Sequence, residues 1–315
     1  MSPARAVLAD VLDRVRPITG GEVANYIPQL ALADPDAFGI AAVSTSGAVY
    51  EAGDSGVLFS IQSVSKPFVY ALALQQLGVS EVTKRVGLEP SGEPFNAISL
   101  DEETGRPMNP MINAGAIVVS SLIEGDTAMA KFESITAMLA SFAGRELEVD
   151  TAVFASELET GDRNRALAHL AHGAGVLGSS ADIAVEAYFR QCSVTVTARD
   201  IAVMSATLAS AGRNPLTGRQ VVSEATARWT MGVMAGSGMY DASGEWLTRV
   251  GLPAKSGVSG GIAAIDPGYF GFGAYSPRLD ARGNSTRGIA ALELLSSEHG
   301  LHMFAHPAAT FDPFA

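Results

Sequence analysis

The sequence predicts an α+β fold, in which an antiparallel sheet is flanked by helices and a mostly helical block is inserted between strands of that sheet. Short apolar segments with turn residues between them occur near both ends of the chain, at residues 38–43, 48–51, 253–258, 260–265 and 269–275. Such segments are typical of neighbouring antiparallel strands. Between the two groups, residues 63–212 have mostly helical spacing of apolar side chains. Strands from both ends of the chain are therefore expected to share one sheet.

The chain opens with a predicted helix and a predicted hairpin. The helix is indicated by a run of apolar residues at helical spacing, namely Val7, Leu8, Val11, Leu12 and Val15. Gly20 and Gly21 follow and are expected to end it. Residues 44–47 are turn formers between the strands at 38–43 and 48–51, which predicts a hairpin.

The inserted block contains two helices with recognisable ends. The first has an apolar stripe closed by Gly144, made of Phe132, Ile135, Met138, Leu139 and Phe142. Thr197 and Asp200 are spaced as a capping box that opens the second, which we expect to end at Gly212. A closing helix is predicted over residues 286–298. We treat 1–315 as one unit, with a sheet subdomain over about 1–65 and 213–315 and a helical subdomain over about 66–212.

The composition excludes several classes of partner. The net charge is -12, and both nucleic acid and anionic membranes would repel it. A single cysteine, Cys192, rules out an internal disulfide framework.

The sequence also shows no clear export or membrane segment. Asp10 and Asp13 make the N-terminal stretch a poor secretory signal, and the weakly polar run at 111–123 is too short to span a bilayer. We expect a soluble cytoplasmic protein that binds neither nucleic acid nor membrane.

The sharpest chemical pattern is Ser63 followed three residues later by Lys66. On a helix these two side chains lie on one face within reach of each other. A serine hydroxyl is a weak nucleophile until a base takes its proton, and a desolvated lysine can be that base. The pattern therefore predicts a serine nucleophile with a lysine base.

Pro67 restricts where this helix can begin. Proline is tolerated only in the first turn, so the helix must start near Ser63. The backbone N–H of Ser63 then lies among the unpaired donors at a positive helix end, where it can stabilise an oxyanion. The same helix end would help to keep the Lys66 amine neutral.

Two further observations strengthen this interpretation. The chain has four lysines against 17 arginines, so the few lysines are candidates for sites that require a neutral amine. One of them, Lys255, stands in Lys255-Ser256-Gly257 on a predicted strand. Ser-x-x-Lys followed far downstream by Lys-Ser/Thr-Gly is the motif pair of the penicillin-recognising enzymes.

One competing nucleophile remains open at this stage. Residues 257–261 fit the Gly-x-Ser-x-Gly nucleophile elbow, which would make Ser259 the nucleophile. The elbow needs a strand, a turn and a helix within a parallel sheet, whereas the predicted surroundings are antiparallel strands. The histidine that it requires could be any of three that follow Ser259, namely His299, His302 and His306.

Other candidates are weaker. His169 and His172 have the spacing of a metal pair, but no third ligand is evident, and a satisfied pair on a helix is the better interpretation. Cys192 is expected to be a small buried apolar residue. We therefore predict no metal and no organic cofactor.

Over residues 21–304 the chain resembles the serine-dependent glutaminases. The resemblance rests on blocks at 23–30, 62–68, 89–96, 109–117, 191–193, 238–244, 251–258 and 283–289. It implies the fold shared by penicillin-binding proteins and serine β-lactamases. It also implies hydrolysis of L-glutamine to L-glutamate and ammonia, and assembly as a homodimer or homotetramer.

The resemblance also implies roles for individual residues. Ser63 matches the nucleophile, Lys66 its base, and Tyr240 a tyrosine that aids proton transfer. The backbone N–H groups of Ser63 and Val258 match the oxyanion hole. The residues that match the glutamine site are Tyr26, Gln62, Ser63, Asn113, Glu157, Asn164, Tyr188, Tyr240 and Val258.

The chemistry of these side chains suits free glutamine. Glu157 can pair with the α-ammonium, while neutral amides and phenols can bond the α-carboxylate without a competing charge. Glu157 and Asn164 are seven residues apart, and Gly161 between them predicts a turn. Ser237, Trp246 and Ser259 depart from residues common in the family, and none is a matched catalytic position.

Two other functions were weighed. A β-lactamase or penicillin-binding hydrolase would need an extracytoplasmic address and a Ser-x-Asn-type motif between the two lysine motifs, and we identify neither. A non-catalytic glutamine-binding or assembly protein would have no need of Ser63, Lys66, Tyr240 and Lys255 together.

Overall fold

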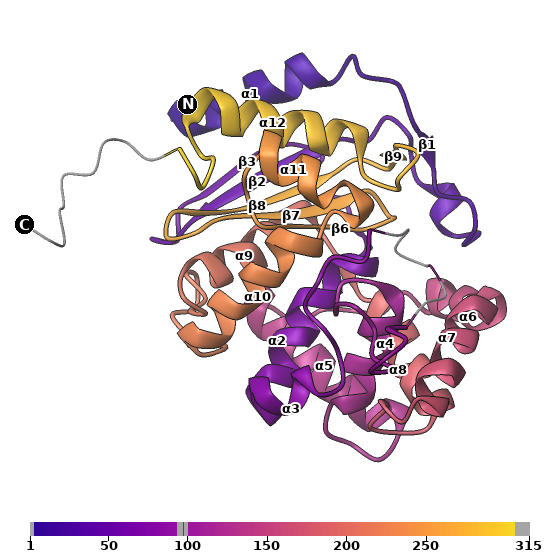
Figure 1. The fold of residues 1–315 in the computed structure, drawn as a ribbon. Coiled ribbons are helices and arrows are strands. Elements are labelled where there is room, and N and C mark those ends of the chain that lie inside the picture. The colour runs from indigo at the N-terminus through magenta and orange to yellow at the C-terminus, as the bar shows by residue number, and fades with distance from the viewer. Residues whose placement is uncertain (1–2, 93–96, 98–99, 306–315) are drawn as a thin grey trace, which may run out of the picture.

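The computed structural model describes residues 3–92, 97 and 100–305. Within these residues, five antiparallel strands form the main sheet in the order β3-β2-β8-β7-β6. Their bounds are β2 Gly39–Ser44, β3 Val49–Gly53, β6 Ala254–Ser256, β7 Gly261–Asp266 and β8 Phe270–Tyr275. The N-terminal hairpin joins the C-terminal strands because β2 pairs with β8, with Ile40 opposite Ala274 (Figure 1). The predicted α+β class and the shared sheet are confirmed.

Helices cover both faces of this sheet. Two terminal helices, α1 (Pro3–Val15) and α12 (Thr286–His299), lie side by side on one face, and α9 (Ala198–Ala209) lies against the other (Figure 1). The approach of α9 is possible because β8 presents glycines to it. A Cβ added at Gly271 would stand 1.9 Å from the Ala206 nitrogen, and one at Gly273 would stand 2.0 Å from the Ala198 oxygen.

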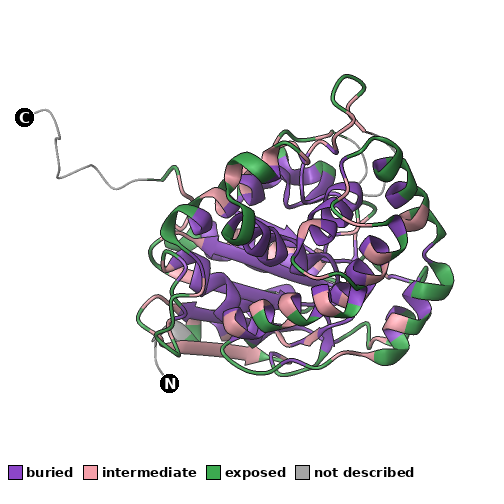
Figure 2. Cartoon of the chain, turned by 90° about the horizontal axis from the view of Figure 1, so that it is seen from below, coloured by how far each residue is buried: buried purple, intermediate pink, exposed green. Residues whose placement is uncertain are grey.

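The helices α2 to α8 form a second body beside the sheet. They are α2 Lys66–Leu77, α3 Val79–Thr83, α4 Asn113–Leu122, α5 Ala128–Ala143, α6 Thr151–Thr160, α7 Asp162–Gly173 and α8 Ala181–Cys192. Figure 2 shows that the buried residues run through the sheet and the inner helices, while exposed residues gather on the outer helices and loops. The helix α2 is buried from Lys66 to Leu74, so it occupies the centre of this body.

Several predicted helix ends agree with the structure. Thr127 caps α5 and Gly144 closes it in the left-handed conformation, with φ at 74°. The predicted capping box of Thr197 and Asp200 is present at the start of α9. The predicted end of that helix is wrong by three residues, because α9 ends at Ala209 and the chain turns through Ser210 before Gly212.

The division into subdomains at residues 65/66 and 212/213 stays a prediction. The helix α9 belongs by sequence to the predicted helical part, yet it packs on the sheet. Residues 93–96 of the block at 89–96, and His306, lie outside the described residues. None of the helices in the described part of the chain is long and apolar enough to cross a membrane.

Several elements of the structure have no counterpart in the sequence-based prediction. Two pairs of two-residue strands are present, β1 Glu22–Val23 with β9 Arg278–Leu279, and β4 Phe59–Ser60 with β5 Thr195–Val196. The 3-10 helices η1 Leu30–Leu32 and η3 Tyr240–Ala242, and the helices α10 Glu224–Ser237 and α11 Ser243–Arg249, also have no counterpart in the prediction. Where the sequence predicts the start of an α-helix near Ser63, the structure has the 3-10 helix η2 Gln62–Ser65, and α2 begins three residues later, at Lys66. Among these, β4, η2 and η3 carry or adjoin the residues of the site.

Candidate active site

Ser63 lies in η2, between β4 and α2. The segment is anchored where the Ile61 N–H donates to the Val194 carbonyl at 2.7 Å. Gln62 then adopts a left-handed conformation, with φ at 48°, which is uncommon for a residue other than glycine. Lys66 begins α2, and Pro67 lies in its first turn, as the sequence predicts. Ser63 is 4% exposed and Lys66 is 1% exposed, so both lie inside the protein.

The Lys66 ammonium position has two hydrogen-bond acceptors. Its Nζ donates to the Asn113 side-chain oxygen at 2.7 Å and to the Met111 carbonyl at 3.2 Å. Burial lowers the pKa of Lys66 to about 7, while the negative forms of Cys192 and Glu157 favour the charged amine. Burial, rather than the helix end that the sequence suggested, is the largest cause.

Asn113 connects three helices at the floor of the site. Its Oδ1 accepts hydrogen bonds from Lys66 at 2.7 Å and from the Tyr188 hydroxyl at 3.2 Å. Its Nδ2 donates to the Asn164 side-chain oxygen at 3.0 Å. These partners define which end of the Asn113 amide faces Lys66. The contact between Lys66 and Asn113 was not predicted from the sequence. A Ser-x-Asn motif would have indicated it, but Met111 stands two residues before Asn113, where that motif has serine. The available indication in the sequence was that a polar residue, Asn113, begins an otherwise apolar helix.

A pocket of about 130 Å³ contains most of the predicted site. Its lining includes the predicted residues Tyr26, Gln62, Ser63, Asn113, Glu157, Asn164, Tyr188 and Val258. Four further residues line the pocket: Gly161, which the sequence predicted only as a turn, and Ile27, Thr160 and Arg163, which it did not assign to the site. Residues from positions 26 to 258 of the chain thus meet around one small cavity.

Glu157 is the buried carboxyl group of this pocket. It is 5% exposed, and burial raises its pKa to about 7, while a hydrogen bond from Gln62 and the charge of Lys66 act in the opposite direction. Gly161 separates α6, which carries Glu157, from α7, which carries Asn164. A Cβ at Gly161 would lie 2.2 Å from the Phe189 ring, so only glycine permits this predicted turn.

Tyr240 lies beside Ser63. Its hydroxyl donates to the Ser256 carbonyl at 3.0 Å and also forms a hydrogen bond with the Ser63 side chain. Burial raises the pKa of Tyr240, so its phenol is protonated at neutral pH. The backbone of Tyr240 is left-handed, with φ at 57°.

Lys255 lies beneath the Tyr240 ring on β6. Its Nζ is 4.2 Å from the ring centroid and donates to the carbonyls of Gly238 at 3.0 Å and Ser256 at 2.6 Å. Lys255 is fully buried, and burial lowers its pKa well below the ordinary value, helped by the charge of Lys66. The two lysine motifs therefore meet at Tyr240 and Ser63.

The turn after β6 bears on the interpretation of Ser259 as a nucleophile elbow. Residues 257–260 connect β6 to the antiparallel strand β7, with Gly257 N–H donating to Gly261 and Gly260 N–H donating to Gly257, both at 2.9 Å. A nucleophile elbow would require a helix after this turn. The elbow interpretation of Ser259 is therefore wrong in its structural context.

The remaining sequence candidates lie apart from this chemistry. His169 and His172 are both exposed on α7, and no cluster of three or more metal-ligating side chains occurs in residues 3–92, 97 and 100–305. Cys192 is buried, as expected, and burial raises the pKa of its thiol.

Comparison with known proteins identifies relatives of the whole described fold. A family model described as Glutaminase matches residues 21–304. The chain is 54% identical to Glutaminase 1 of Bradyrhizobium diazoefficiens over 90% of this chain and 46% of that protein, and 52% identical to Glutaminase 2 of the same organism over 96% and 48%. It thus spans about half the length of these two relatives. It is 48% identical to a glutaminase of Nostoc sp. over 96% of this chain and 91% of that one.

Solved structures agree with the sequence comparisons. The crystal structure of Mglu in its glutamate form is 45% identical, with a TM-score of 0.94, and the match covers 98% of this chain and 71% of that one. A probable glutaminase of Bacillus subtilis is 35% identical, with a TM-score of 0.89 and coverage of 95% and 97%. These neighbours have the β-lactamase-like fold, so that part of the fold prediction is confirmed.

Proposed function

Since the chain belongs to the glutaminase family, we propose that it hydrolyses the side-chain amide of L-glutamine to L-glutamate and ammonia, through an acyl-enzyme on Ser63. One observation carries the proposal. Ser63 and the predicted ammonium ligand Glu157 line the same small pocket, and buried Lys66, with a pKa of about 7, begins the helix that follows Ser63.

Lys66 is the proposed base. A neutral amine has two N–H donors and one lone pair. The Met111 carbonyl and the Asn113 amide oxygen accept the two donors, which leaves the lone pair for the Ser63 proton. Tyr240 is a poor alternative base, because burial raises the pKa of its phenol whereas burial lowers the pKa of Lys66.

The reaction follows acyl-transfer chemistry. Lys66 takes the hydroxyl proton as the Ser63 oxygen bonds to the glutamine side-chain carbonyl carbon. The backbone N–H groups of Ser63 and Val258 stabilise the resulting oxyanion. The carbon–nitrogen bond then breaks, and the leaving nitrogen receives a proton from Lys66, directly or through Tyr240. Water then attacks the ester carbonyl carbon and gives a proton to Lys66. The bond between that carbon and the Ser63 oxygen breaks, and Lys66 passes the proton to the Ser63 oxygen, which restores the hydroxyl and the neutral amine and releases glutamate.

The pocket matches the rest of glutamine. Glu157 pairs with the α-ammonium, and this pairing favours its ionised form. Asn164, Tyr188 and Tyr26 offer neutral groups to the α-carboxylate. The Asn113 amide also contributes to glutamine binding, although its oxygen already accepts a hydrogen bond from Lys66. All steps use side chains and backbone of the chain, so the scheme requires no metal or organic cofactor.

The size of the pocket favours a small substrate. Sites for drug-sized ligands enclose ~300–1,000 Å³, whereas this cavity holds about 130 Å³. A free amino acid is a better match than a bicyclic β-lactam with its side chain. The homodimer or homotetramer and the cytoplasmic location that the resemblance implies stay predictions.

Ser63→Ala tests the proposal. Removing the nucleophile should lower glutamine turnover by at least about a thousandfold. Ammonia release is measured with glutamine and asparagine, nitrocefin colour change is measured in parallel, and circular dichroism checks that the fold is retained. Ser205→Ala, at a buried serine of α9, is the matched control and should keep wild-type turnover. Wild-type ammonia release by Ser63→Ala would refute the assignment.

The acyl-enzyme can also be detected directly. Hydroxylamine added during turnover should capture the γ-acyl group as a hydroxamate, and mass spectrometry of rapidly quenched enzyme should locate a glutamyl group on the peptide that contains Ser63. Neither product should form in Ser63→Ala.

A further inference from the structure

The segment that carries Tyr240 is held in an unusual backbone conformation. Tyr240 begins the 3-10 helix η3 with φ at 57°, in the left-handed region that residues with a Cβ avoid. Such a residue persists only where surrounding contacts over-determine it. From this backbone position the phenol reaches Ser63 and the Ser256 carbonyl.

Ser243 closes the turn around Tyr240. Its hydroxyl donates to the Tyr240 carbonyl at 2.7 Å and accepts the Met239 N–H at 3.0 Å. Ser243 thereby bonds to the residue before Tyr240 and to Tyr240 itself. The side chain is buried, at 4% exposed, so water does not compete for these bonds.

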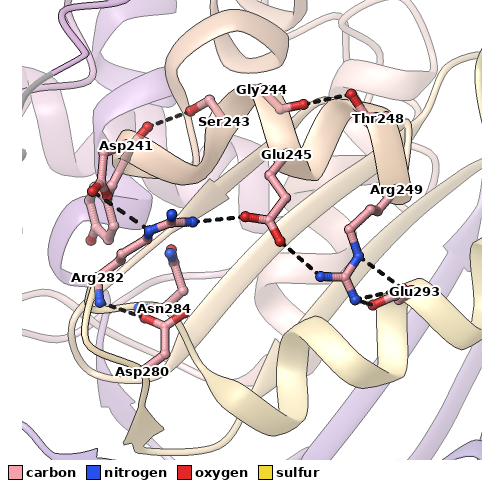
Figure 3. A network of polar contacts seen from close by, with 11 residues as sticks. Asp241, Ser243, Gly244, Glu245, Thr248, Arg249, Asp280, Arg282, Asn284 and Glu293 are labelled. Atoms are coloured by element: carbon pink, nitrogen blue, oxygen red, sulfur yellow. Dashed lines mark hydrogen bonds and ion pairs between the residues drawn. The ribbon is translucent and has the colours of Figure 1, made fainter.

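The ion pairs that this segment and the helix after it form are at the surface. Figure 3 shows Arg282 between Asp241 and Glu245, and Arg249 between Glu245 and Glu293. The Asp241–Arg282 pair is 3.7 Å apart, with 34% and 46% of the side chains exposed. Exposed pairs of this kind contribute little to stability. Compared with these ion pairs, the buried Ser243 hydroxyl is the stronger restraint on the turn, and it acts together with the buried packing of Met239 and Tyr240.

We propose that Ser243 is a positioning residue for the reaction: it holds Tyr240 in the left-handed conformation from which the phenol contacts the Ser63 hydroxyl. The inference rests on the proposed function, because it assigns a role through Tyr240 in Ser63 chemistry. Ser243 is not among the residues that line the pocket, so its role concerns turnover rather than glutamine binding.

The chain contains a matched control for Ser243. Ser121 is 1% exposed, donates to the carbonyl three residues earlier, Val118, at 2.6 Å, and accepts the Gly178 N–H at 2.9 Å. Ser121→Ala therefore removes the same kinds of bond at similar burial, near the C-terminal end of α4 and away from Tyr240.

The test compares Ser243→Ala with Ser121→Ala. Ser243→Ala should lower kcat for glutamine about 10- to 100-fold, with KM within about twofold of wild type, because small displacements of a proton-transfer group slow the chemical step. Ser121→Ala should keep kcat within about twofold. Equal effects of the two variants on kcat, or a change in KM alone, would overturn the inference. Ser243→Cys, which keeps the side chain's shape with a weak donor and acceptor, should show the same loss if the alanine variant does not fold.

A double-mutant cycle separates positioning from general damage. If Ser243 acts through Tyr240, adding Ser243→Ala to Tyr240→Phe should lower kcat by less than about twofold further. Independent, multiplying losses would contradict the inference.

A measurement without turnover distinguishes this inference from the proposed function. In protein labelled with 13C at the tyrosine phenol carbon, the Tyr240 resonance, assigned by its loss in Tyr240→Phe, should shift in Ser243→Ala and not in Ser121→Ala. An unmoved Tyr240 resonance would overturn the positioning role. Absence of ammonia release by the wild-type protein would instead refute the proposed function, whatever the resonance does.

Discussion

At the scale of single residues, Lys66 and Glu157 have pKa values that burial moves toward neutrality from opposite sides. Burial lowers the pKa of Lys66 from 10.5 to about 7 and raises that of Glu157 from 4.5 to about 7. The apolar surroundings disfavour the charged form of each group. The attraction between the two opposite charges compensates for this desolvation only in part. Near pH 7 both groups are therefore able to gain or lose a proton.

Activity should fall as the pH decreases through about 7. In the proposed reaction, Lys66 must be neutral to accept the Ser63 proton, and Glu157 must be ionised to hold the α-ammonium, so both must be deprotonated. The logarithm of kcat/KM should decline with a slope that approaches two below pH 7, measured by ammonia release across pH 5 to 9 in buffers of constant ionic strength. A profile that is flat between pH 6 and pH 8 would contradict the two assignments.

Glu157→Gln should stabilise the fold while impairing binding. The folded carboxyl keeps its proton up to about pH 7, whereas the unfolded one loses it near 4.5, so the folded state binds more protons in this window. The contribution of Glu157 to the free energy of unfolding therefore falls as the pH rises from about 4.5 to about 7, and it is lowest above pH 7. At pH 8 the variant should gain up to ~3 kcal/mol, or several degrees in Tm. At pH 4 the gain should vanish.

The control for this variant is Glu159→Gln, at an exposed position of the same helix. It should change neither Tm nor KM, while Glu157→Gln should raise KM for glutamine at least about tenfold. A lower Tm at pH 8 in Glu157→Gln would show that the buried charge stabilises the fold.

At the scale of secondary-structure elements, the contact between α9 and the sheet depends on missing side chains. Gly271 and Gly273 on β8 allow backbone atoms of α9 to approach where a Cβ would overlap them. Backbone cannot yield as a flexible side chain does, so even one methyl group should displace the helix. The helix α9 also contacts β2 and β7. A displacement of α9 should therefore disturb its packing on three strands of the sheet.

Gly273→Ala should therefore destabilise the protein by about 1–3 kcal/mol or more, measured by urea unfolding. Gly232→Ala is the matched control. Gly232 is exposed within α10, has nothing within 4 Å of an added Cβ and carries no positive φ, so alanine should stabilise by roughly 0.5–1 kcal/mol. Equal effects of the two substitutions would contradict this account of the α9 contact.

At the scale of the whole molecule, the site lies where the edge strand β6 meets the helical body. The turn after β6 supplies Val258, η2 supplies Ser63, and α4, α6, α7 and α8 supply the residues opposite them. Glu157 is buried in the small pocket, which the exposed Arg163 also lines. In the proposed function, salt should screen the pair of Glu157 with the α-ammonium only weakly.

Turnover should depend weakly on salt. Glutamine has no net charge at pH 7, so the negative surface does not steer it, and a buried pair is screened little. Between 50 and 300 mM NaCl, kcat/KM should change by less than about twofold, measured at pH 8, where Glu157 is ionised. A change of tenfold or more would indicate that exposed charges contribute to binding.

The sequence by itself determined the features that neighbouring residues control. The order of strands and helices, the caps of α5 and α9 and the placement of Pro67 in the first turn of α2 follow from apolar periodicity and from local hydrogen bonds. The scarcity of lysine and the two lysine motifs selected Ser63, Lys66 and Lys255 on chemical grounds. Roles for the other site residues came from the resemblance, not from local pattern.

Only the tertiary structure decided which distant residues meet and how far each is desolvated. Lys66 donates a hydrogen bond to Asn113, which is 47 residues away in the chain, and Tyr240 donates one to the Ser256 carbonyl, with a turn and a helix between them in the chain. No local pattern specifies such contacts, because they depend on how α2, α4 and β6 pack. The two-residue strands, the left-handed turns at Gln62 and Tyr240 and the pKa values near 7 share that origin. Burial is a property of the assembled protein, and burial sets the protonation of the site.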